Sequence, residues 1–378
     1  ECARCTTVCP ASQSGKPLSP MKIITDIRQK LYSETLNLNN QNGSLVGGMI
    51  SETELWSCTT CGACMEECPV LIEHVPTITD MRRHLVLSEG KPPEQSNESL
   101  EKTLQNGNPW GMPQHERLKW AEDFNLDLPT LADKKEVDVL YWVGCAGSYD
   151  PRNQGIARDL VKILKNANVD FAILGKEETC TGDSARRLGE EYLFETLAKQ
   201  NIDTLNKYKF NTVITACPHC FQVISNEYKD FGGNYNVMHH SEYIQKLIDS
   251  KKIEVRSNID ETITYHDACY LGRYNDIYQA PRNIIESLLN KGELVEMKDH
   301  KSESLCCGAG GGNMWHEISE GDRINVMRFE QAVEIEADTV VTACSFCAIM
   351  MEDAKKVTGN EEKIKTVDIA ELVSNSLD

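Results

Sequence analysis

The sequence has no apolar segment that approaches the roughly 20 residues needed to cross a bilayer, so nothing in it is expected to span a membrane. It has too few positive charges to bind nucleic acid, because 39 lysines and arginines are outnumbered by 58 aspartates and glutamates. No signal-peptide pattern opens the chain, and no motif for a nicotinamide or flavin cofactor is present. These absences favour a soluble body, and the net charge of −19 favours a partner protein with a positive patch.

Cysteine, by contrast, is abundant, with 16 residues in a chain of 378. A secreted scaffold stabilised by disulfides would explain such a number, but those proteins are usually small and poor in core residues. This chain is long and 40% hydrophobic, and its cysteines are grouped at the spacings of metal ligands. We therefore expect free thiols in a reducing, cytoplasmic compartment.

Two groups of cysteines lie near the start of the chain. One is the complete run Cys58-x2-Cys61-x2-Cys64-x3-Cys68-Pro69, and the other, Cys2-x2-Cys5-x3-Cys9-Pro10, matches its last three cysteines. This spacing is typical of ferredoxins with two [4Fe–4S] clusters, in which the cysteine before proline binds the other cluster. The sequence therefore predicts two cubane clusters. Their expected ligands are Cys2, Cys5 and Cys68 for the first, and Cys9, Cys58, Cys61 and Cys64 for the second.

The first of these clusters lacks one ligand, which the spacing puts three positions before Cys2. That position falls before residue 1, so we expect the sequence to be a fragment of a longer polypeptide. Zinc is the alternative for two CxxC pairs. The four-cysteine run followed by proline is far more specific for iron–sulfur clusters.

Five further cysteines stand toward the end of the chain, at Cys269, Cys306, Cys307, Cys344 and Cys347. A cubane uses four thiolates, and the side chains of adjacent cysteines diverge, so one simple metal ion rarely binds both. Five sulfurs with an adjacent pair predict a larger or opened cluster with a bridging thiolate. Cys307 is the expected bridging ligand.

A glycine-rich run, from Gly308 to Gly312, follows the adjacent cysteines. Glycine lets the backbone approach closely, and N–H groups at Gly308 and Gly310 are predicted to donate to sulfurs and tune the potential. Phosphate binding is the competing interpretation, but no G-K-[ST] follows the run. His266, shortly before Cys269, is predicted to tune the cluster or move protons, or to be satisfied structurally.

The second half of the chain contains a duplication, because TVITACPHC, from Thr212, and TVVTACSFC, from Thr339, are near copies. Thr181 stands where the first copy would carry the second cysteine of the adjacent pair, and threonine is a poor ligand for iron or zinc. The thiolates of the first copy suit a zinc ion, a cubane, or a remnant that only supports packing. They belong to Cys145, Cys180, Cys217 and Cys220.

Strand and helix patterns alternate from residue 137 onward, and the cysteines follow predicted strands, where open α/β sheets place their ligands. The expected strands are Val137–Val143, Phe171–Leu174, Thr212–Ala216, Thr262–His266, Leu294–Met297 and Thr339–Thr342. We predict an α+β multidomain fold, with an all-α two-cluster ferredoxin-like domain followed by two duplicated α/β lobes with mainly parallel sheets. The expected segments are the domain at 1–90, a linker at 91–136, and lobes at 137–256 and 257–378. Trp110 and Trp120 are expected to anchor the linker to a neighbouring surface.

Two helices are expected in the first domain. One begins at Pro20, is capped by Ser19, and carries an apolar face that reaches Leu31; the other runs from about Thr77 to Ser88. The pair His239-His240 is predicted to lie on the surface, with a contact on the haem side as the alternative.

The order Cys269, Cys306-Cys307-Gly308 and Cys344-x2-Cys347 resembles the CCG domain of heterodisulfide-reductase-type iron–sulfur proteins. The resemblance implies a non-cubane [4Fe–4S] cluster on the five cysteines, and Thr181 puts a second such cluster in doubt. The segments GKPLSPMKIITDIR, ELWSCTTCGACMEECPV, HVPTITDMRRHLVLSEG and CTGDSARR resemble the membrane-associated electron-transfer-flavoprotein:menaquinone oxidoreductases. That branch implies a preceding membrane domain with haem b.

The resemblance implies an electron relay at the cytoplasmic face of the membrane. Reduced electron-transfer flavoprotein would feed the clusters, which would pass electrons toward haem b and menaquinone. The alternative is a heterodisulfide reductase that cleaves a disulfide at the non-cubane cluster. A zinc-stabilised interaction scaffold is a third interpretation, which the cysteine spacing disfavours.

Overall fold

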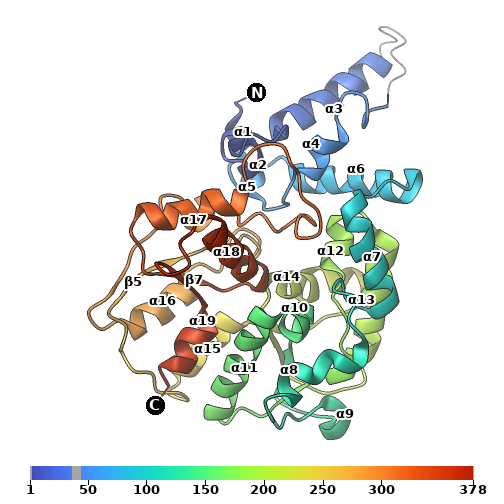
Figure 1. Cartoon of the computed structure of the whole chain (residues 1–378). Coiled ribbons are helices and arrows are strands. Elements are labelled where there is room, and N and C mark those ends of the chain that lie inside the picture. The colour runs from blue at the N-terminus through green and yellow to red at the C-terminus, as the bar shows by residue number, and fades with distance from the viewer. Residues whose placement is uncertain (1, 36–43, 378) are drawn as a thin grey trace.

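Residues 2–35 and 44–377 are described by the computed structural model, in which a group of helices at the start of the chain lies against two α/β lobes (Figure 1). The first group consists of α1 (Arg4–Thr7), α2 (Pro10–Gln13), α3 (Pro20–Thr35), α4 (Glu52–Trp56), α5 (Ala63–Glu66) and α6 (His74–Glu89). This arrangement, with the parallel sheets described below, confirms the predicted fold class.

The short helices α1 and α5 are built alike around the front cysteines. Each follows a residue with a left-handed backbone, Ala3 with φ 61° and Gly62 with φ 77°, and each carries a buried cysteine, Cys5 or Cys64. A tight turn after one cysteine thus points the side chain of the next cysteine into the interior of the domain as well. The repeated geometry matches the repeated sequence spacing.

The two helices predicted for this region are present. Ser19 caps α3, because its hydroxyl accepts a hydrogen bond from the N–H of Lys22 at 3.3 Å, and α6 ends at Gly90 with φ 67°. The predicted apolar face of α3 is only partly buried: Ile23 is inaccessible, but Leu31 is 60% exposed. The reason is that the far end of α3 extends away from the rest of the fold (Figure 1).

Residues 91–136, predicted as a linker, contain helices that the sequence analysis did not predict. They are α7 (Glu94–Asn106), the 3₁₀ turn η1 (Gln114–Leu118), α8 (Lys119–Glu122) and α9 (Leu131–Lys134). Trp120 is buried in the core of the lobes, and Trp110 packs edge to face on Trp315 with ring centroids 5.1 Å apart. Both tryptophans are therefore the packing anchors that the sequence predicted.

The first lobe has a four-stranded parallel sheet in the order β2-β1-β3-β4. Its strands are β1 (Val139–Trp142), β2 (Phe171–Ile173), β3 (Thr212–Thr215) and β4 (Val237–His239). Its helices and turns are α10 (Gly144–Tyr149), α11 (Pro151–Asn166), η2 (Gly175–Glu177), α12 (Asp183–Arg187), α13 (Glu191–Leu205), α14 (Pro218–Gln222), η3 (Val223–Glu227), η4 (Tyr228–Phe231) and α15 (His240–Asp249).

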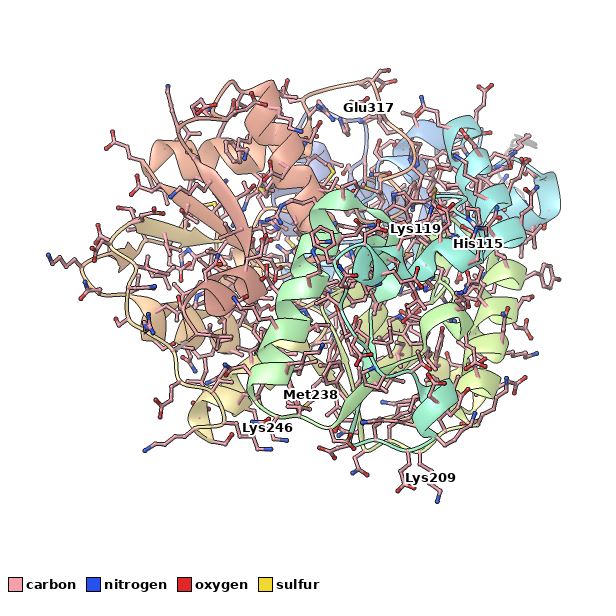
Figure 2. All side chains as sticks on the ribbon, turned by 60° about the horizontal axis from the view of Figure 1, so that its bottom comes forward. His115, Lys119, Lys209, Met238, Lys246 and Glu317 are labelled. Carbon is pink, nitrogen blue, oxygen red and sulfur yellow. The ribbon has the colours of Figure 1, made fainter. Side chains whose placement is uncertain are left out.

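The second lobe repeats this topology, with a parallel sheet in the order β6-β5-β7-β8. Its strands are β5 (Thr262–Tyr265), β6 (Glu293–Leu294), β7 (Thr339–Thr342) and β8 (Lys365–Asp368), and its helices and turn are α16 (Gln279–Leu288), η5 (Lys301–Glu303), α17 (Ile324–Glu334), α18 (Ser345–Val357) and α19 (Ile369–Asn375). One hydrophobic core runs through both lobes. Lys209, Lys246 and Glu317 illustrate the charged side chains that extend outward from this body (Figure 2).

The surface position predicted for His239-His240 is wrong, since both side chains are inaccessible to solvent. His239 ends β4, and the next residue, His240, pairs through Nε2 with the carboxylate of Asp368 at 2.9 Å. Asp368 ends β8, the corresponding edge strand of the other lobe. Because these two strand ends meet, the histidine pair becomes part of the contact between lobes.

Candidate iron–sulfur centres

All 16 cysteines are free, and all except Cys2 are buried. The structure brings Cys2, Cys5 and Cys68 near one another, and burial raises the pKa of the Cys5 thiol. The N–H of Ile72 donates to Cys68 Sγ at 3.3 Å, the kind of contact that stabilises a thiolate. These three thiols are those predicted for the first cubane.

The four thiols predicted for the second cubane line one enclosed cavity. Its other walls are largely apolar and include Leu18, Val75 and Ile78. Burial raises the pKa of Cys9 to about 12, so an unliganded thiol here stays protonated and a cationic centre is needed to hold thiolates. Four converging thiols at the spacing of a two-cluster ferredoxin therefore fit a cubane.

The five thiols predicted for the second lobe also converge. Cys306 contacts Cys269 and Cys307, and Cys307 Sγ lies 3.3 Å from Cys347 Sγ. The N–H of Gly308 donates to Cys306 Sγ at 3.3 Å, which is the kind of contact predicted for the glycine-rich run. Cys344 belongs to the same buried group, because it shares one core cluster with Cys307 and Cys347. The set is thus assembled by the ends of β5 and β7 and by the loop before α17.

His266 lies beside these thiols, with one ring nitrogen within 4.8 Å of the sulfurs of Cys307 and Cys347. Its Nδ1 accepts a hydrogen bond from Arg328 Nε at 3.0 Å, so the ring proton of the neutral form is on Nε2. Burial and then Arg328 lower the pKa of His266 to about 3. The ring is therefore neutral, and Nε2 is its donor.

The glycine-rich run serves mainly to let two sites approach each other. A Cβ atom on Gly310 would stand 2.3 Å from the carbonyl oxygen of Thr59, and one on Gly311 would stand 2.2 Å from that of Cys58. These backbones touch, which leaves no room for a phosphate between them. Cys61, in the same front loop, packs in one buried cluster with Cys306, and Cys306 together with burial raises the pKa of the Cys61 thiol. The site of the second cubane and the five-thiol site are therefore neighbours.

The four thiols of the first lobe line an enclosed cavity of their own. Cys145 Sγ lies 3.9 Å from Cys180 Sγ, and the N–H of Gly182 donates to Cys180 at 3.4 Å, just as Gly308 donates to Cys306 in the other lobe. Thr181 also lines the cavity. The site therefore gathers four buried thiols, as the second cubane site does.

A buried ion pair holds the loop that carries Cys145. The carboxylate of Glu178 accepts hydrogen bonds from the N–H groups of Val143 at 3.0 Å and Gly144 at 2.8 Å, and it pairs with the guanidinium of Arg117. Glu178 and Arg117 are both about 1% exposed. A buried charge pair that also satisfies backbone donors fixes a loop firmly.

Two buried arginines hold the front loop against the lobes, and the sequence analysis did not identify them. Arg82 donates to the carbonyls of Leu55, Cys58, Arg187 and Gly311. Arg273 donates to the carbonyl of Cys61 at 3.2 Å and to that of Ser302 at 2.8 Å. Arginine alone supplies enough donors for such sets, but no pattern in the sequence marks these two among 39 basic residues.

His219 is a further residue that the sequence analysis missed. It lies between Cys217 and Cys220, and its Nδ1 pairs with Asp183 at 3.0 Å. Burial opposes the charged form of His219, but the negative charge of Asp183 and its hydrogen bond to the ring raise the pKa of His219 to about 10, so the ring is charged. The duplicated segment carries Phe346 at the corresponding position. That difference between otherwise similar copies could have drawn attention to His219.

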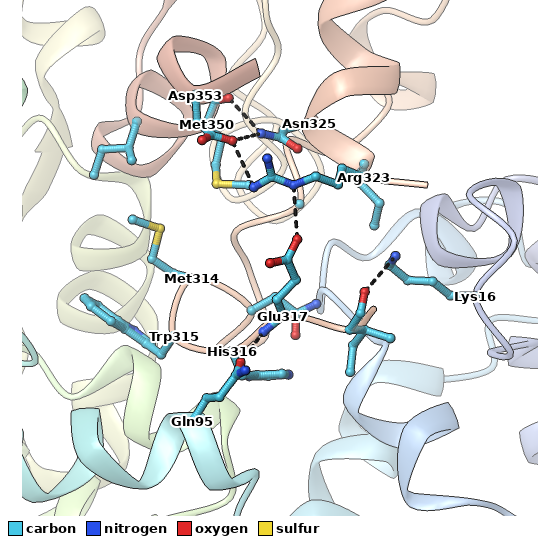
Figure 3. Close-up of a pocket in the computed structure, with 15 residues that line it drawn as sticks. Lys16, Gln95, Met314, Trp315, His316, Glu317, Arg323, Asn325, Met350 and Asp353 are labelled. Atoms are coloured by element: carbon cyan, nitrogen blue, oxygen red, sulfur yellow. Dashed lines mark hydrogen bonds and ion pairs between the residues drawn. The ribbon is translucent and has the colours of Figure 1, made fainter. Parts of the chain in front are cut away.

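An open pocket of about 390 Å³ lies beside the five-thiol site and reaches Gly308 (Figure 3). Arg323 crosses it, pairing with Glu317 at 3.2 Å and with Asp353 at 3.0 Å. Lys16, from the front helices, donates to the carbonyl of Glu320 at 2.8 Å on the same loop. The pocket thus joins the first domain to the second lobe and brings solvent to the residue after Cys307.

Among the described residues, no helix is long and apolar enough to traverse a lipid bilayer. Residues 139–225 and 263–352 match the family model of the cysteine-rich CCG domain, and residues 1–72 match that of the 4Fe-4S dicluster domain. The fold and these matches define a class of proteins that combine a dicluster module with two CCG lobes.

Three curated relatives align with the whole chain. A probable iron-sulfur-binding oxidoreductase, FadF, of Bacillus subtilis is 39% identical, and the EtfAB:quinone oxidoreductase of Syntrophomonas wolfei is 36% identical. The chain spans 59% and 57% of the length of these two relatives. A polypeptide of the dihydromethanophenazine:CoB--CoM heterodisulfide reductase of Methanosarcina barkeri is 30% identical, with 92% of its length covered. The chain belongs to the family of CCG-domain iron–sulfur proteins that includes these oxidoreductases.

Proposed function

We propose that this chain is the iron–sulfur part of an electron relay between electron-transfer flavoprotein and a membrane partner with haem b and menaquinone. The clusters held by its thiolates would supply one-electron transfer. The proposed ligands are those predicted from the sequence, and the proposed location is the cytoplasmic face of the membrane. Relatives named as an EtfAB:quinone oxidoreductase and a probable iron-sulfur-binding oxidoreductase support this proposal.

The observation that carries the proposal is that Cys61 of the second cubane site packs in one buried cluster with Cys269 and Cys306 of the five-thiol site. Cys64 of the second cubane site packs in the same way with Cys5 of the first site. A relay needs such a series, because electrons move efficiently only between closely spaced centres.

We extend the proposal to the first lobe, with a four-iron centre on its four thiols. Cys145, Cys180, Cys217 and Cys220 line one buried cavity, as do the thiols of the second cubane site, and the N–H of Gly182 donates to Cys180 as that of Gly308 donates to Cys306. Thr181 in place of a fifth thiol favours a cubane over the non-cubane cluster proposed for the second lobe.

Heterodisulfide reduction is the second candidate, and the relative from Methanosarcina barkeri supports it. A disulfide substrate would need space beside the five-thiol site. Between the two lobes that space is occupied by rings, since His219 lies 4.1 Å from Tyr270 and 5.2 Å from Phe346, measured between centroids. The open pocket that reaches Gly308 is the side from which a disulfide could enter. The higher identity of the two oxidoreductase relatives, 39% and 36% against 30%, favours the relay.

The two candidates are separated by stopped-flow reduction of the purified protein. We expect electron-transfer flavoprotein, reduced by its acyl-CoA dehydrogenase, to bleach the cluster absorbance within one turnover. We expect no reduction of a mixed disulfide of two thiol coenzymes with an artificial donor. Fast disulfide reduction, with a flavoprotein that cannot reduce the clusters, would reverse the assignment.

A further inference from the structure

We propose that three stacked rings, those of His219, Tyr270 and Tyr274, form a junction through which a redox centre in the first lobe exchanges electrons with the other centres. This ring junction rests on the proposed function, because it needs a cluster at the first-lobe thiols. It gives three residues outside the ligand sets a role in the relay.

The rings form a continuous stack across the boundary between lobes. The ring of Tyr270 lies between the other two, 4.1 Å from His219 at an interplanar angle of 27° and 4.5 Å from Tyr274 at 16°. Tyr270 is 1% exposed and His219 is 5% exposed. Stacked rings in a dry interior provide atoms at van der Waals spacing where a gap or water would otherwise interrupt the path.

Two of the three rings are attached to thiol sites. His219 stands inside the Cys217-x2-Cys220 turn of the first lobe, and Tyr270 directly follows Cys269 of the second lobe. Phe346, in the Cys344-x2-Cys347 turn, also lies 5.2 Å from His219. The stack therefore joins the backbones that carry ligands of two sites.

The third site is reached through hydrogen bonds. Tyr270 Oη lies 2.8 Å from Thr60 Oγ1, and the hydroxyl of Tyr274 donates to the carbonyl of Thr60 at 2.7 Å. Thr60 belongs to the loop between Cys58 and Cys61, and its own N–H donates to Cys58 Sγ at 3.3 Å. The path from Tyr270 to a ligand of the second cubane thus crosses only two side chains and one loop.

The surroundings hold the rings in place. Asp183 accepts from His219 Nδ1 and from Arg187 Nε, at 3.0 and 3.1 Å. The guanidinium of Arg187 lies 5.4 Å from the centre of the Tyr270 ring, and Glu227 pairs with Arg187 from the other side. These fixed charges hold His219 and Tyr270 in position, and no carboxylate contacts the ring of Tyr270 among the interactions of this group.

The ring junction is not repeated by the duplication, because the two lobes differ at the positions of its rings. His219 corresponds to Phe346, but the residue after Cys145, which corresponds to Tyr270, is Ala146. One lobe alone contributes the central ring. In the exchange, one electron leaves a reduced centre at one end and enters an oxidised centre at the other, and the rings are neither oxidised nor deprotonated.

The test compares Tyr270→Leu with Tyr270→Phe in the full chain with its iron and sulfide content determined. Dithionite is the reductant, so the result does not depend on electron-transfer flavoprotein. Freeze-quenched EPR spectra follow each centre separately. We expect Tyr270→Leu to slow equilibration of the first-lobe centre by on the order of tenfold or more, because a leucine cannot keep the stacked contacts. Tyr270→Phe keeps the stack and should restore most of the rate.

Tyr265→Leu is the matched control, because Tyr265 is equally buried but outside the junction. If Tyr270→Leu fails to load its clusters, His219→Leu against His219→Phe gives the same comparison. Equal rates in the leucine and aromatic variants would overturn the proposal, as would zinc in place of iron in the first lobe. Failure of electron-transfer flavoprotein to reduce the protein, with the dithionite result as expected, would overturn only the proposed donor.

Discussion

Thr181 of the first lobe takes the position that Cys307 takes in the second. Thr181 Oγ1 lies 3.9 Å from Cys220 Sγ, and Cys307 Sγ lies 3.3 Å from Cys347 Sγ. Both residues precede a glycine with a left-handed backbone, Gly182 with φ 89° or Gly308 with φ 91°. The two lobes are therefore the same site with one sulfur replaced by oxygen.

The first prediction uses this equivalence. Thr181→Cys restores five thiols in the first lobe, and we expect the reconstituted variant to show a second non-cubane EPR signal besides that of the second lobe. The space is already sized for a sulfur contact, so little strain is expected. Thr181→Ser keeps the hydroxyl and should leave the spectrum unchanged; an unchanged spectrum for Thr181→Cys as well would contradict the proposed equivalence.

The complementary change is Cys307→Ser. Serine oxygen is a poor bridging ligand for iron, so we expect the non-cubane signal to be lost while both front cubanes keep theirs. EPR of the reduced and oxidised protein measures both at once. Loss of the front signals with survival of the second-lobe signal would show that the ligand assignment is wrong.

The content of the first lobe is tested by Cys220→Ser. If the lobe holds a four-iron centre, this change should lower the iron and the acid-labile sulfide by about four per chain and leave zinc unaffected. Elemental analysis of the variant beside the wild type gives the difference directly. A fall of one zinc per chain would identify a zinc site, and no change in either metal would identify a packing remnant.

Arg82→Met should destabilise the protein by about 3 kcal/mol. The change leaves four buried carbonyls without their donors, from the front domain and both lobes, and only part of this cost is offset by removal of a buried charge. The shift in the urea midpoint measures it. Arg83→Met is the control, since the partly exposed Arg83 pairs with Asp80 and Glu191 at the surface and should cost less than about 1 kcal/mol.

We expect the stability of the protein to depend on pH through His316. This residue is 6% exposed, and its Nδ1 forms a hydrogen bond with Ser96 Oγ at 2.8 Å. Burial, and then Arg82, lower the pKa of His316 from 6.5 to about 4. As the pH falls, the unfolded chain therefore binds this proton at a higher pH than the folded protein does. The contribution of neutral His316 to the free energy of unfolding is complete above pH 6.5 and is lost as the pH falls toward 4, with a limit of about 3 kcal/mol.

The measurement is the free energy of unfolding at several pH values, for the wild type and for His316→Gln. Glutamine keeps a polar partner for Ser96 but does not titrate, so the variant should lose less stability between pH 6.5 and 4. Parallel curves for the two proteins would show that His316 is not the responsible group.

Much of the fold follows from local patterns. Six of the eight strands in the described residues were predicted, because short apolar runs before cysteines or turns identify buried parallel strands. The sequence did not predict β4 and β8. Val237–His239 is short and partly exposed, and in Lys365–Asp368 buried residues alternate with more exposed ones and most side chains are polar. The burial of His239-His240 was also missed, because it depends on a contact with Asp368, which is distant in sequence.

The sequence by itself determined which atoms are available as ligands, because cysteine spacing within a loop is a local property that limits where three or four sulfurs can point. Only the tertiary structure decided how the sites lie relative to one another. The contact of Cys61 with Cys306, the passage of the glycine-rich run over Thr59 and the stack of His219 on Tyr270 all join segments distant in the chain. Such contacts arise from the packing of whole domains, and the sequence of a single segment does not predict them.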